Sequence, residues 1–285
     1  MNLPSLEHFF IIGSPRSGTS MFRLMLNSHP EVIVPPESGF AHWLSDKYSA
    51  LPLDNTEILK NFAEDTINSR KFETWGLSHK ELEFYFNEYQ VSTYEQLCQL
   101  VYYAYAQEKN KNIRLTGDKN NYYIKHIESL QNKFPSAKFL LLVRDVKDVV
   151  CSCLDLHEKK INSIYKPEFS SSIKDIAIEW NEDNLEASKL LSNNICVVRY
   201  EDLITNPEEE LIKVCTYLDI KYSSNMIKYY MNNDEPEEFL QWKKKTLEAP
   251  DSNNMNKYIS KLSYDEIILI NDVASEALSL FNYNR

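Results

Sequence analysis

The sequence has little glycine and no arrangement of cysteines that would form a covalent framework. Only 5 of its 285 residues are glycine, so two glycines in one short loop point to a backbone requirement there. The cysteines are odd in number and scattered, at Cys98, Cys151, Cys153, Cys196 and Cys215. This distribution excludes a disulfide framework, and Cys151-x-Cys153 has no second pair or histidine cluster to complete a zinc site.

An excess of positive charge and a long hydrophobic run are missing as well. The formal net charge of −11 argues against general nucleic-acid binding, which requires a basic surface. No stretch approaches the roughly 20 apolar residues needed to span a bilayer. The N-terminus has neither a basic leader nor a long apolar signal core, so we expect a cytoplasmic protein with no membrane span. Local arginines and lysines would have to bind any anionic ligand.

What the sequence does contain, near its start, is an apolar strand, a glycine-bounded loop and an amphipathic helix. Phe9 to Ile12 is rich in aromatic and β-branched residues, which is typical of a strand buried in a parallel sheet. Gly13 and Gly18 bound the loop, and apolar residues recur at helical spacing from Thr19 onward. Such a unit aims backbone N–H groups and the positive end of a helix at one anion.

The loop has the spacing of the phosphate loop G-x-x-x-x-G-K-[ST], except that Thr19 stands where the lysine should be. In nucleotide triphosphatases that lysine reaches the β- and γ-phosphates, so its absence disfavours triphosphate chemistry. The loop instead contains Arg16, whose guanidinium can bind a phosphate or sulfonate through two hydrogen bonds. These residues predict a nucleotide with one 5′ phosphate-like group and no requirement for a metal.

The segment from Pro15 to Ser20 resembles the 5′-phosphosulfate loop of the sulfotransferases. That family transfers a sulfuryl group from 3′-phosphoadenosine 5′-phosphosulfate (PAPS) and releases 3′,5′-adenosine bisphosphate (PAP). The resemblance implies that the loop binds the cofactor through Arg16, Ser17, Gly18, Thr19 and Ser20.

Two later segments are similar to the same family in their order and spacing. Lys138 to Val143 predicts a central strand that Arg144 closes, and Ser152 follows on the second turn of the next helix. A guanidinium and a hydroxyl at this spacing match the family's 3′-phosphate site. Ile195 to Tyr200 predicts another buried strand, which leads into a segment similar to the family's Tyr-Glu-Asp-Leu turn. The resemblance places Tyr200 near the adenine and ribose.

The last third of the chain offers weaker signals. Lys257 stands where relatives have a basic residue that contacts the cofactor, although the glycine and tryptophan that accompany it are missing. The resemblance makes Lys257 an expected cofactor contact. The run Lys243-Lys244-Lys245 is interpreted as a solvated surface run, with a place in a cofactor lid as the alternative.

Two residues near predicted strand ends are candidates for catalysis together with Arg16. Lys119 follows the strand expected at 113–116, and a lysine at the carboxyl end of a strand points into the crevice of an open α/β sheet. Glu37 follows a short strand expected at 32–34. The resemblance implies that Glu37 is the general base, and partial burial would raise its pKa and strengthen it in that role.

A histidine base is not expected at its usual place. In the cytosolic members of the family a catalytic histidine lies two positions after the lysine, and this chain has Asn121 there. The alternative base is His42, five residues beyond Glu37.

Together these features predict one sulfotransferase domain over residues 1–285. The implied fold is α/β in three layers, with helices flanking a central, mostly parallel sheet as in P-loop nucleotide kinases. We expect a helical insertion on the acceptor side at about 41–110, and a C-terminal lid and helix at about 233–285. The many aromatic residues of the insertion suit either the core or an acceptor pocket.

The predicted function is transfer of a sulfuryl group from PAPS to a hydroxyl or amine, without a metal. A small polar natural product or a glycan is the favoured acceptor, while a lipid or a peptide tyrosine stays open. A P-loop phosphotransferase and a non-catalytic nucleotide-binding module are the alternative functions. The sequence leaves the oligomeric state open.

Overall fold

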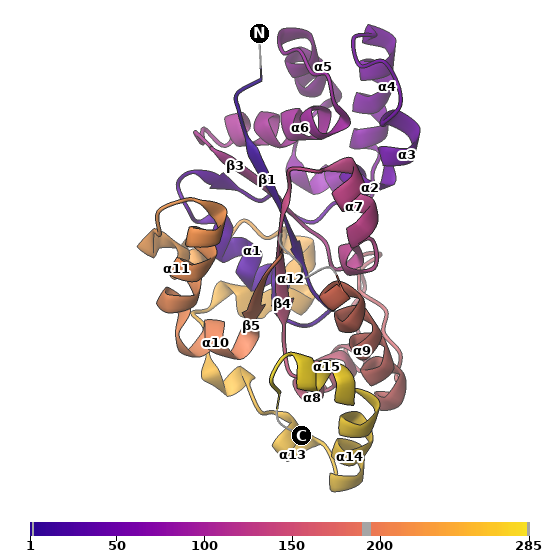
Figure 1. Ribbon diagram of the computed structural model, residues 1–285, viewed down its shortest axis with the longest axis vertical. Helices are drawn as coiled ribbons and strands as arrows, with labels where there is room; N and C mark the ends of the chain where they lie inside the picture. Colours follow the sequence, from indigo (N-terminus) through magenta and orange to yellow (C-terminus); the bar gives the residue numbers. More distant parts are fainter. Residues whose placement is uncertain (2, 190–194, 284–285) are drawn as a thin grey trace.

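The centre of the molecule is a parallel sheet of five strands in the order β2-β3-β1-β4-β5 (Figure 1). The computed structural model describes residues 1, 3–189 and 195–283. The strands are β1 (Glu7–Ile12), β2 (Val32–Ile33), β3 (Leu115–Lys119), β4 (Lys138–Val143) and β5 (Ile195–Arg199). The predicted α/β class with a flanked parallel sheet is therefore confirmed.

Helices separate the strands and follow the last one. The helices named below are α1 (Thr19–Asn27), α2 (Phe40–Trp43), α3 (Ser45–Tyr48), α4 (Thr56–Ile67), α5 (His79–Glu88), α6 (Tyr94–Glu108), α7 (Ile127–Lys133), α8 (Val146–His157), α9 (Ile173–Lys189), α10 (Tyr200–Thr205), α11 (Pro207–Leu218), α12 (Glu237–Lys243), α13 (Tyr258–Lys261), α14 (Tyr264–Val273) and α15 (Ser275–Leu280).

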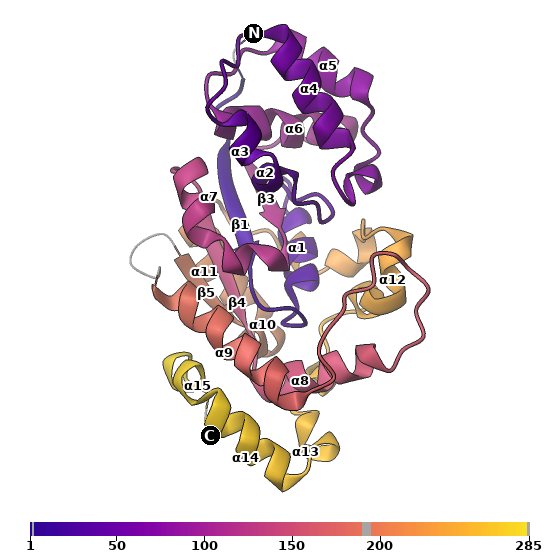
Figure 2. The same cartoon turned by 90° about the vertical axis from the view of Figure 1, so that its right-hand side faces the viewer.

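Alternation of side chains along the strands divides the core between the two faces of the sheet. Phe9 and Ile11 of β1 belong to one core cluster, together with apolar residues of α1, α10 and α11. Phe10 and Ile12 belong to the other, with apolar residues of α6, α7, α8 and α9. Figure 2 shows α9 lying along the body of the molecule, with α14 and α15 packed beyond it. Because both faces are covered, β1 and β4 can be apolar almost throughout.

The strand β5 departs from its prediction as a buried strand. It pairs only with β4, so it forms an edge of the sheet. Val198 is buried, whereas Val197 is 37% exposed. An apolar sequence run alone does not distinguish an edge strand from an interior one, and the prediction of burial was wrong for this reason.

The aromatic residues between positions 54 and 110 mostly form core. Phe62, Trp75, Tyr94, Tyr102 and Tyr105 are all buried and belong to the same cluster as Phe10. They lie in or beside α4, α5 and α6, at the end of the molecule where the strands begin (Figure 1). These side chains therefore stabilise the fold, and Tyr102 and Trp75 also donate to Asp118 and to the carbonyl oxygen of Pro36.

The loop between β1 and α1 depends on left-handed backbone at two positions. Arg16 has φ 69° and Gly18 has φ 98°. A Cβ atom at Gly18 would lie 2.6 Å from Cδ2 of Tyr200, the first residue of α10. Only glycine can adopt this left-handed backbone and also leave room for the Tyr200 ring without strain. The loop conformation and the position of the Tyr200 ring are thus linked.

We predict that Gly18→Ala destabilises the protein more than Gly76→Ala does. Gly76 also has a positive φ, 71°, but no atom lies within 4 Å of the place where its Cβ would be. Both substitutions add left-handed strain of about 1–3 kcal/mol, and Gly18→Ala adds the clash with Tyr200. Urea unfolding of the two variants measures the difference. Equal losses of stability in the two variants would show that the Tyr200 ring moves aside without a loss of folding free energy.

Candidate active site

A cavity of about 690 Å³ opens where the parallel strands end. Its walls include the loop and the start of α1, the residues after β3, β4 and β5, the segment 164–169 and residues between 241 and 257. In a parallel sheet the carboxyl ends of all strands lie at one edge, which is the usual place for a ligand in an open α/β fold. The topology therefore collects side chains that are far apart in the sequence.

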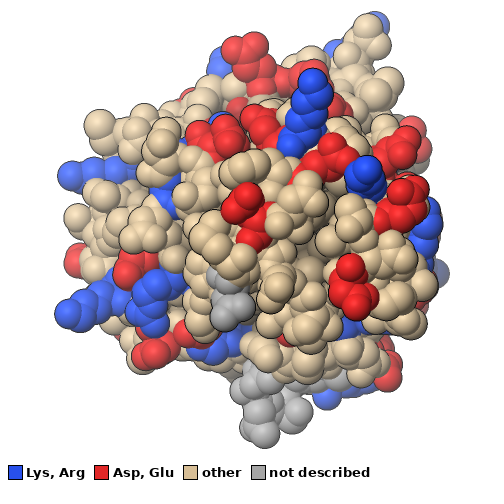
Figure 3. All heavy atoms as spheres, turned by 90° about the horizontal axis from the view of Figure 1, so that it is seen from above, with Lys and Arg blue, Asp and Glu red and all other residues tan. Residues whose placement is uncertain are grey.

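The cavity is basic although the whole chain is acidic. Ten arginines and lysines line it against five aspartates and glutamates, whereas the chain has a formal net charge of −11. On the end of the molecule seen in Figure 3, acidic and basic side chains are interspersed. A concentration of one sign inside a concave site attracts a ligand of the opposite sign. The cavity is thus suited to an anion.

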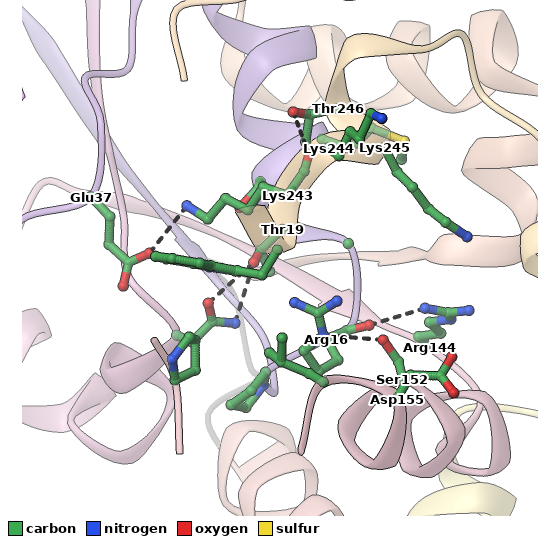
Figure 4. A pocket seen from close by; sticks show the side chains of 18 of the residues that line it. Arg16, Thr19, Glu37, Arg144, Ser152, Asp155, Lys243, Lys244, Lys245 and Thr246 are labelled. Carbon is green, nitrogen blue, oxygen red and sulfur yellow. Dashed lines mark hydrogen bonds and ion pairs between the residues drawn. The ribbon is translucent and has the colours of Figure 1, made fainter. Parts of the chain in front are cut away.

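The loop, α8 and α10 place four of the predicted residues in contact. The Nε of Arg16 donates to the Ser152 hydroxyl at 3.1 Å, and Nη1 of Arg144 donates to the carbonyl oxygen of Arg16 at 3.1 Å (Figure 4). The Arg144 guanidinium also lies over the Tyr200 ring, 4.5 Å from its centre. Two guanidinium groups and a hydroxyl consequently meet at one wall of the cavity.

The segment after α12 adds further positive charge to this wall. Nη2 of Arg144 donates to the carbonyl oxygen of Asn254 at 2.6 Å, and Lys257 donates to the Asn254 side-chain oxygen at 2.9 Å. Lys245 donates to the same oxygen. Burial, together with the nearby charges of Lys257 and Arg144, lowers the pKa of Lys245 to about 8. An anion bound here would relieve the repulsion among these cations.

A second cluster surrounds the carboxylate of Glu37. Lys71 lies 2.9 Å from Oε1, while Lys119 and Lys243 lie 2.8 Å and 3.7 Å from Oε2. Lys119 is the last residue of β3 and Lys243 the last of α12. Figure 4 shows the Lys243 amine pointing toward Glu37 above Thr19. Four segments of the chain therefore converge on one carboxylate.

The expected rise in the pKa of Glu37 is not what the structure shows. Burial alone would raise this pKa, but Lys119, Lys71 and Lys243 together lower it well below its ordinary value. The prediction considered desolvation and not the neighbouring charges, which dominate here. In this arrangement Glu37 is a carboxylate at neutral pH and a weak base.

The interpretation of Lys243 as part of a solvated run was wrong. Its side chain is 10% exposed and also forms an ion pair with Glu235, which is 1% exposed. Lys244 and Lys245 follow in a 3₁₀ turn and line the cavity as well. Lys244 and Lys245 are exposed, as a solvated run predicts, whereas Lys243 ends α12 and turns into the site, which sequence periodicity could not reveal.

Asn121 and the histidines have structural contacts. The Asn121 amide donates to the carbonyl oxygen of Gly13 at 2.8 Å and contacts the Thr19 hydroxyl, so it braces the loop. His42 makes hydrogen bonds with Ser129 and Tyr122. Within the part of the chain that the structure describes, no histidine lines the cavity.

Two predicted residues lie behind the cavity wall. The Ser17 side chain is fully buried and its hydroxyl has no hydrogen-bond partner within the described residues. Lys119 is 1% exposed and reaches the site through its contact with Glu37. By contrast, Lys71, Tyr165 and Trp242 line the cavity although no sequence motif indicates them.

Comparison with known proteins identifies the family. A model described as "Sulfotransferase family" matches residues 8–224. The chain belongs to the sulfotransferase family. A putative protein-tyrosine sulfotransferase of Caenorhabditis briggsae is 26% identical over 232 residues, which are 78% of this chain and 68% of that protein. The protein-tyrosine sulfotransferase of Drosophila melanogaster is 27% identical over 76% of this chain and 39% of its own length.

Solved structures support the fold. The sulfotransferase domain of the Synechococcus PCC 7002 olefin synthase has a TM-score of 0.60 at 22% identity, covering 100% of this chain and 97% of that one. The sulfotransferase domain of the curacin biosynthetic pathway has a TM-score of 0.59 at 20% identity, covering 100% and 99%. The predictions of a sulfotransferase, of an enzyme and of PAPS as its donor are confirmed with the family.

The expected cytoplasmic location was wrong. Proteins similar to this chain are named protein-tyrosine sulfotransferases, and this similarity does not support a cytoplasmic location. The expectation rested on the absence of a leader and of a long apolar run, and this sequence spans as little as 39% of a relative's length. Among the described residues, no helix is long and apolar enough to cross a membrane. A role in natural-product biosynthesis is likewise unsupported.

The lowered pKa values predict how anion binding depends on pH. Burial lowers the pKa of Lys243 to about 8, and Lys245 has a similar value. Both lysines are therefore charged at pH 7 and lose their protons as the pH rises through 8. We expect the affinity for PAP to fall between pH 7 and pH 9, by up to about tenfold, because Lys245 shares its wall of the cavity with Arg144 and Lys257. Calorimetric titration with PAP at several pH values measures this, and a constant affinity would contradict it.

Proposed function

We propose that this protein transfers the sulfuryl group of PAPS to the phenolic hydroxyl of a tyrosine in a peptide or protein. The observation that carries the proposal is the carboxylate of Glu37, which lines the same cavity as the phosphate loop. The relatives named protein-tyrosine sulfotransferases support this acceptor over a glycan or a small natural product.

The pKa of Glu37 also favours a phenol. A carboxylate whose pKa is lowered is a weak base. A phenolic hydroxyl has a pKa of about 10, whereas that of water is about 15.7, and an aliphatic hydroxyl resembles water in this respect. A weak base is better matched to the more acidic proton, so tyrosine is a better acceptor here than a sugar.

The wall of the cavity near Glu37 has a lining that suits an aromatic ring. Lys71, which is paired with Glu37, lies 5.4 Å from the centre of the Phe239 ring. Phe239 in turn contacts Tyr165 and Trp242, with ring centres 5.7 Å and 5.5 Å apart, and both of those residues line the cavity. Aromatic walls bind a phenol ring through edge and face contacts.

The donor is assigned to the wall formed by the loop, α8 and α10. In this proposal the loop from Arg16 to Ser20 holds the 5′-phosphosulfate, while Arg144 and Ser152 bind the 3′-phosphate. Tyr200 contacts the adenine and ribose. Residues 233–257 form a lid that adds Lys257, and the helical unit at about 41–110 adds Arg70 and Lys71 on the acceptor side. Arg16 and Lys119 stabilise the negative charge that develops during transfer.

The proposed activity is tested with PAPS and a pair of peptides that differ only in tyrosine against phenylalanine. We expect mass spectrometry to show sulfation of the tyrosine peptide and none of the phenylalanine peptide. A glycan panel and a panel of small phenols and alcohols are assayed in parallel. Sulfation of a glycan with no modification of the tyrosine peptide would contradict the proposed acceptor.

The role of Glu37 as general base predicts that Glu37→Gln loses about 10²–10⁴-fold in turnover. PAP affinity should be kept, because removing a carboxylate from a cluster of lysines does not weaken attraction for an anion. Glu179→Gln is the matched control, since Glu179 also pairs with a lysine, at 2.6 Å, but on the surface. If the turnover of Glu37→Gln stays near that of the wild type while His42→Ala is inactive, the base is His42.

A further inference from the structure

Lys243 lies between two carboxylates at the end of α12. It forms ion pairs with Glu235 and, at 3.7 Å, with Glu37. The match to the family model ends at residue 224, so Lys243 belongs to a part of the chain that this model does not describe. Its place at the reaction centre follows from the contacts of this structure alone.

A chain of buried charges fixes Lys243 to the helix that follows the phosphate loop. Arg23 of α1 donates to Asp234 at 2.8 Å and to Glu235 at 3.0 Å. Glu235 then holds Lys243, and the side chains of both Arg23 and Glu235 are 1% exposed. A buried ion pair is costly to form and loses several kcal/mol when one partner is removed, so it holds its members in defined positions.

The cluster around Glu37 contains more positive charge than one carboxylate neutralises. Lys71 contacts one oxygen, while Lys119 and Lys243 share the other. Glu235 supplies a second negative charge, and Asp234 supplies a third, but both also neutralise Arg23, so four cations face three carboxylates. One more anion would complete the balance. Of the three lysines on Glu37, Lys243 has the longest contact.

We propose that Lys243 is a catalytic residue that pairs with Glu37 in the free enzyme and with the sulfonate of PAPS when the donor binds. This inference rests on the proposed sulfuryl transfer. Glu235 is the positioning residue that keeps the Lys243 amine within reach of both anions. When Lys243 turns to the sulfonate, Glu37 loses one of its cations and becomes a stronger base.

The step balances with the groups named. The acceptor oxygen forms a bond to sulfur, and the bond between sulfur and the 5′-phosphate oxygen of PAPS breaks. The electron pair of that bond stays on the phosphate oxygen of PAP, and the acceptor's proton passes to the Glu37 carboxylate. Lys243 stays protonated and stabilises the sulfonate oxygens throughout. Glu37 is thus at its weakest as a base while no donor is present.

The first test compares Lys243→Met with Lys213→Met. Lys213 is a matched control because it also lies between two carboxylates, Glu209 and Glu210, but on the exposed face of α11. Dissociation constants for PAPS and PAP are measured without acceptor, and turnover is measured with a tyrosine peptide. We expect Lys243→Met to lose about 10²-fold in turnover. Its affinity should fall about tenfold for PAPS and much less for PAP, because PAP has no sulfonate.

The second test uses Lys243→Arg, which keeps the charge at all accessible pH values. The groups facing the Lys243 amine are Glu235, Glu37 and Lys119, and the Phe239 ring centre is 4.8 Å away. Burial lowers the pKa of Lys243 to about 8. The preference of the wild type for PAPS over PAP should therefore decrease above pH 8. In Lys243→Arg that preference should stay constant, and much of the turnover lost in Lys243→Met should return.

A third variant, Glu235→Gln, tests the positioning role. It should lower turnover and PAPS affinity in the same direction as Lys243→Met, and the double variant should lose little more than Lys243→Met alone. Additive losses in the double variant would show that the two residues act independently. Melting temperatures of all variants show whether each one folds.

Two results would overturn the inference. Equal loss of PAPS and PAP affinity in Lys243→Met would show that the residue only holds the lid in place. Normal turnover in a folded Lys243→Met would show that it does not act on the sulfonate. Failure of the proposed function is distinguishable, because the wild type itself would then leave the tyrosine peptide unmodified by PAPS.

Discussion

The ion pairs of one buried carboxylate connect the parts of this protein that form its site. Glu37 contacts Lys71, Lys119 and Lys243, which come from a turn after α4, the end of β3 and the end of α12. Without this shared anion, the three ammonium groups would repel one another at short range. The same interaction lowers the pKa of Glu37, so the contact that organises the site also weakens the group proposed as its base.

The acidic character of the chain makes the local arrangement of cations decisive. A net charge of −11 repels a nucleotide at long range, where salt screens the field. Inside the cavity the balance is reversed, because basic residues outnumber acidic ones by two to one. Arg16 and Arg144 sit together with the Ser152 hydroxyl at one wall, while the lysines around Glu37 occupy another. Two anionic groups of one ligand are the simplest complement to two such clusters.

The segment after residue 224 contributes much of the chemistry, although the family model ends there. Lys243, Lys245 and Lys257 all come from this segment and all line the cavity. It also provides the main-chain carbonyl of Asn254 that accepts from Arg144. The loop, the sheet and the edge where the strands end thus belong to the shared family core. The lysines of the segment 241–257 lie beyond the region that the family model matches.

The sequence by itself determined the features that depend on short spacing. The strand-loop-helix unit from Phe9 onward, the strand from Lys138 to Val143 and the positions of Arg144 and Ser152 follow from residues close together in the chain. Backbone geometry relates such neighbours directly, so the family and the fold class could be recognised. The short spacing between each residue and the apolar strand before it also located Glu37 and Lys119 near strand ends.

The tertiary structure alone decided the features that depend on contact between distant residues. Lys71 and Lys243 have no local pattern that indicates a site, and they reach Glu37 only because the turn after α4 and the end of α12 fold toward β3. The pKa of Glu37 moved opposite to its prediction, because three charges outweigh burial. The exposure of β5 was set by its place at the sheet edge. Electrostatic energy and burial depend on distances in space, which sequence spacing does not give.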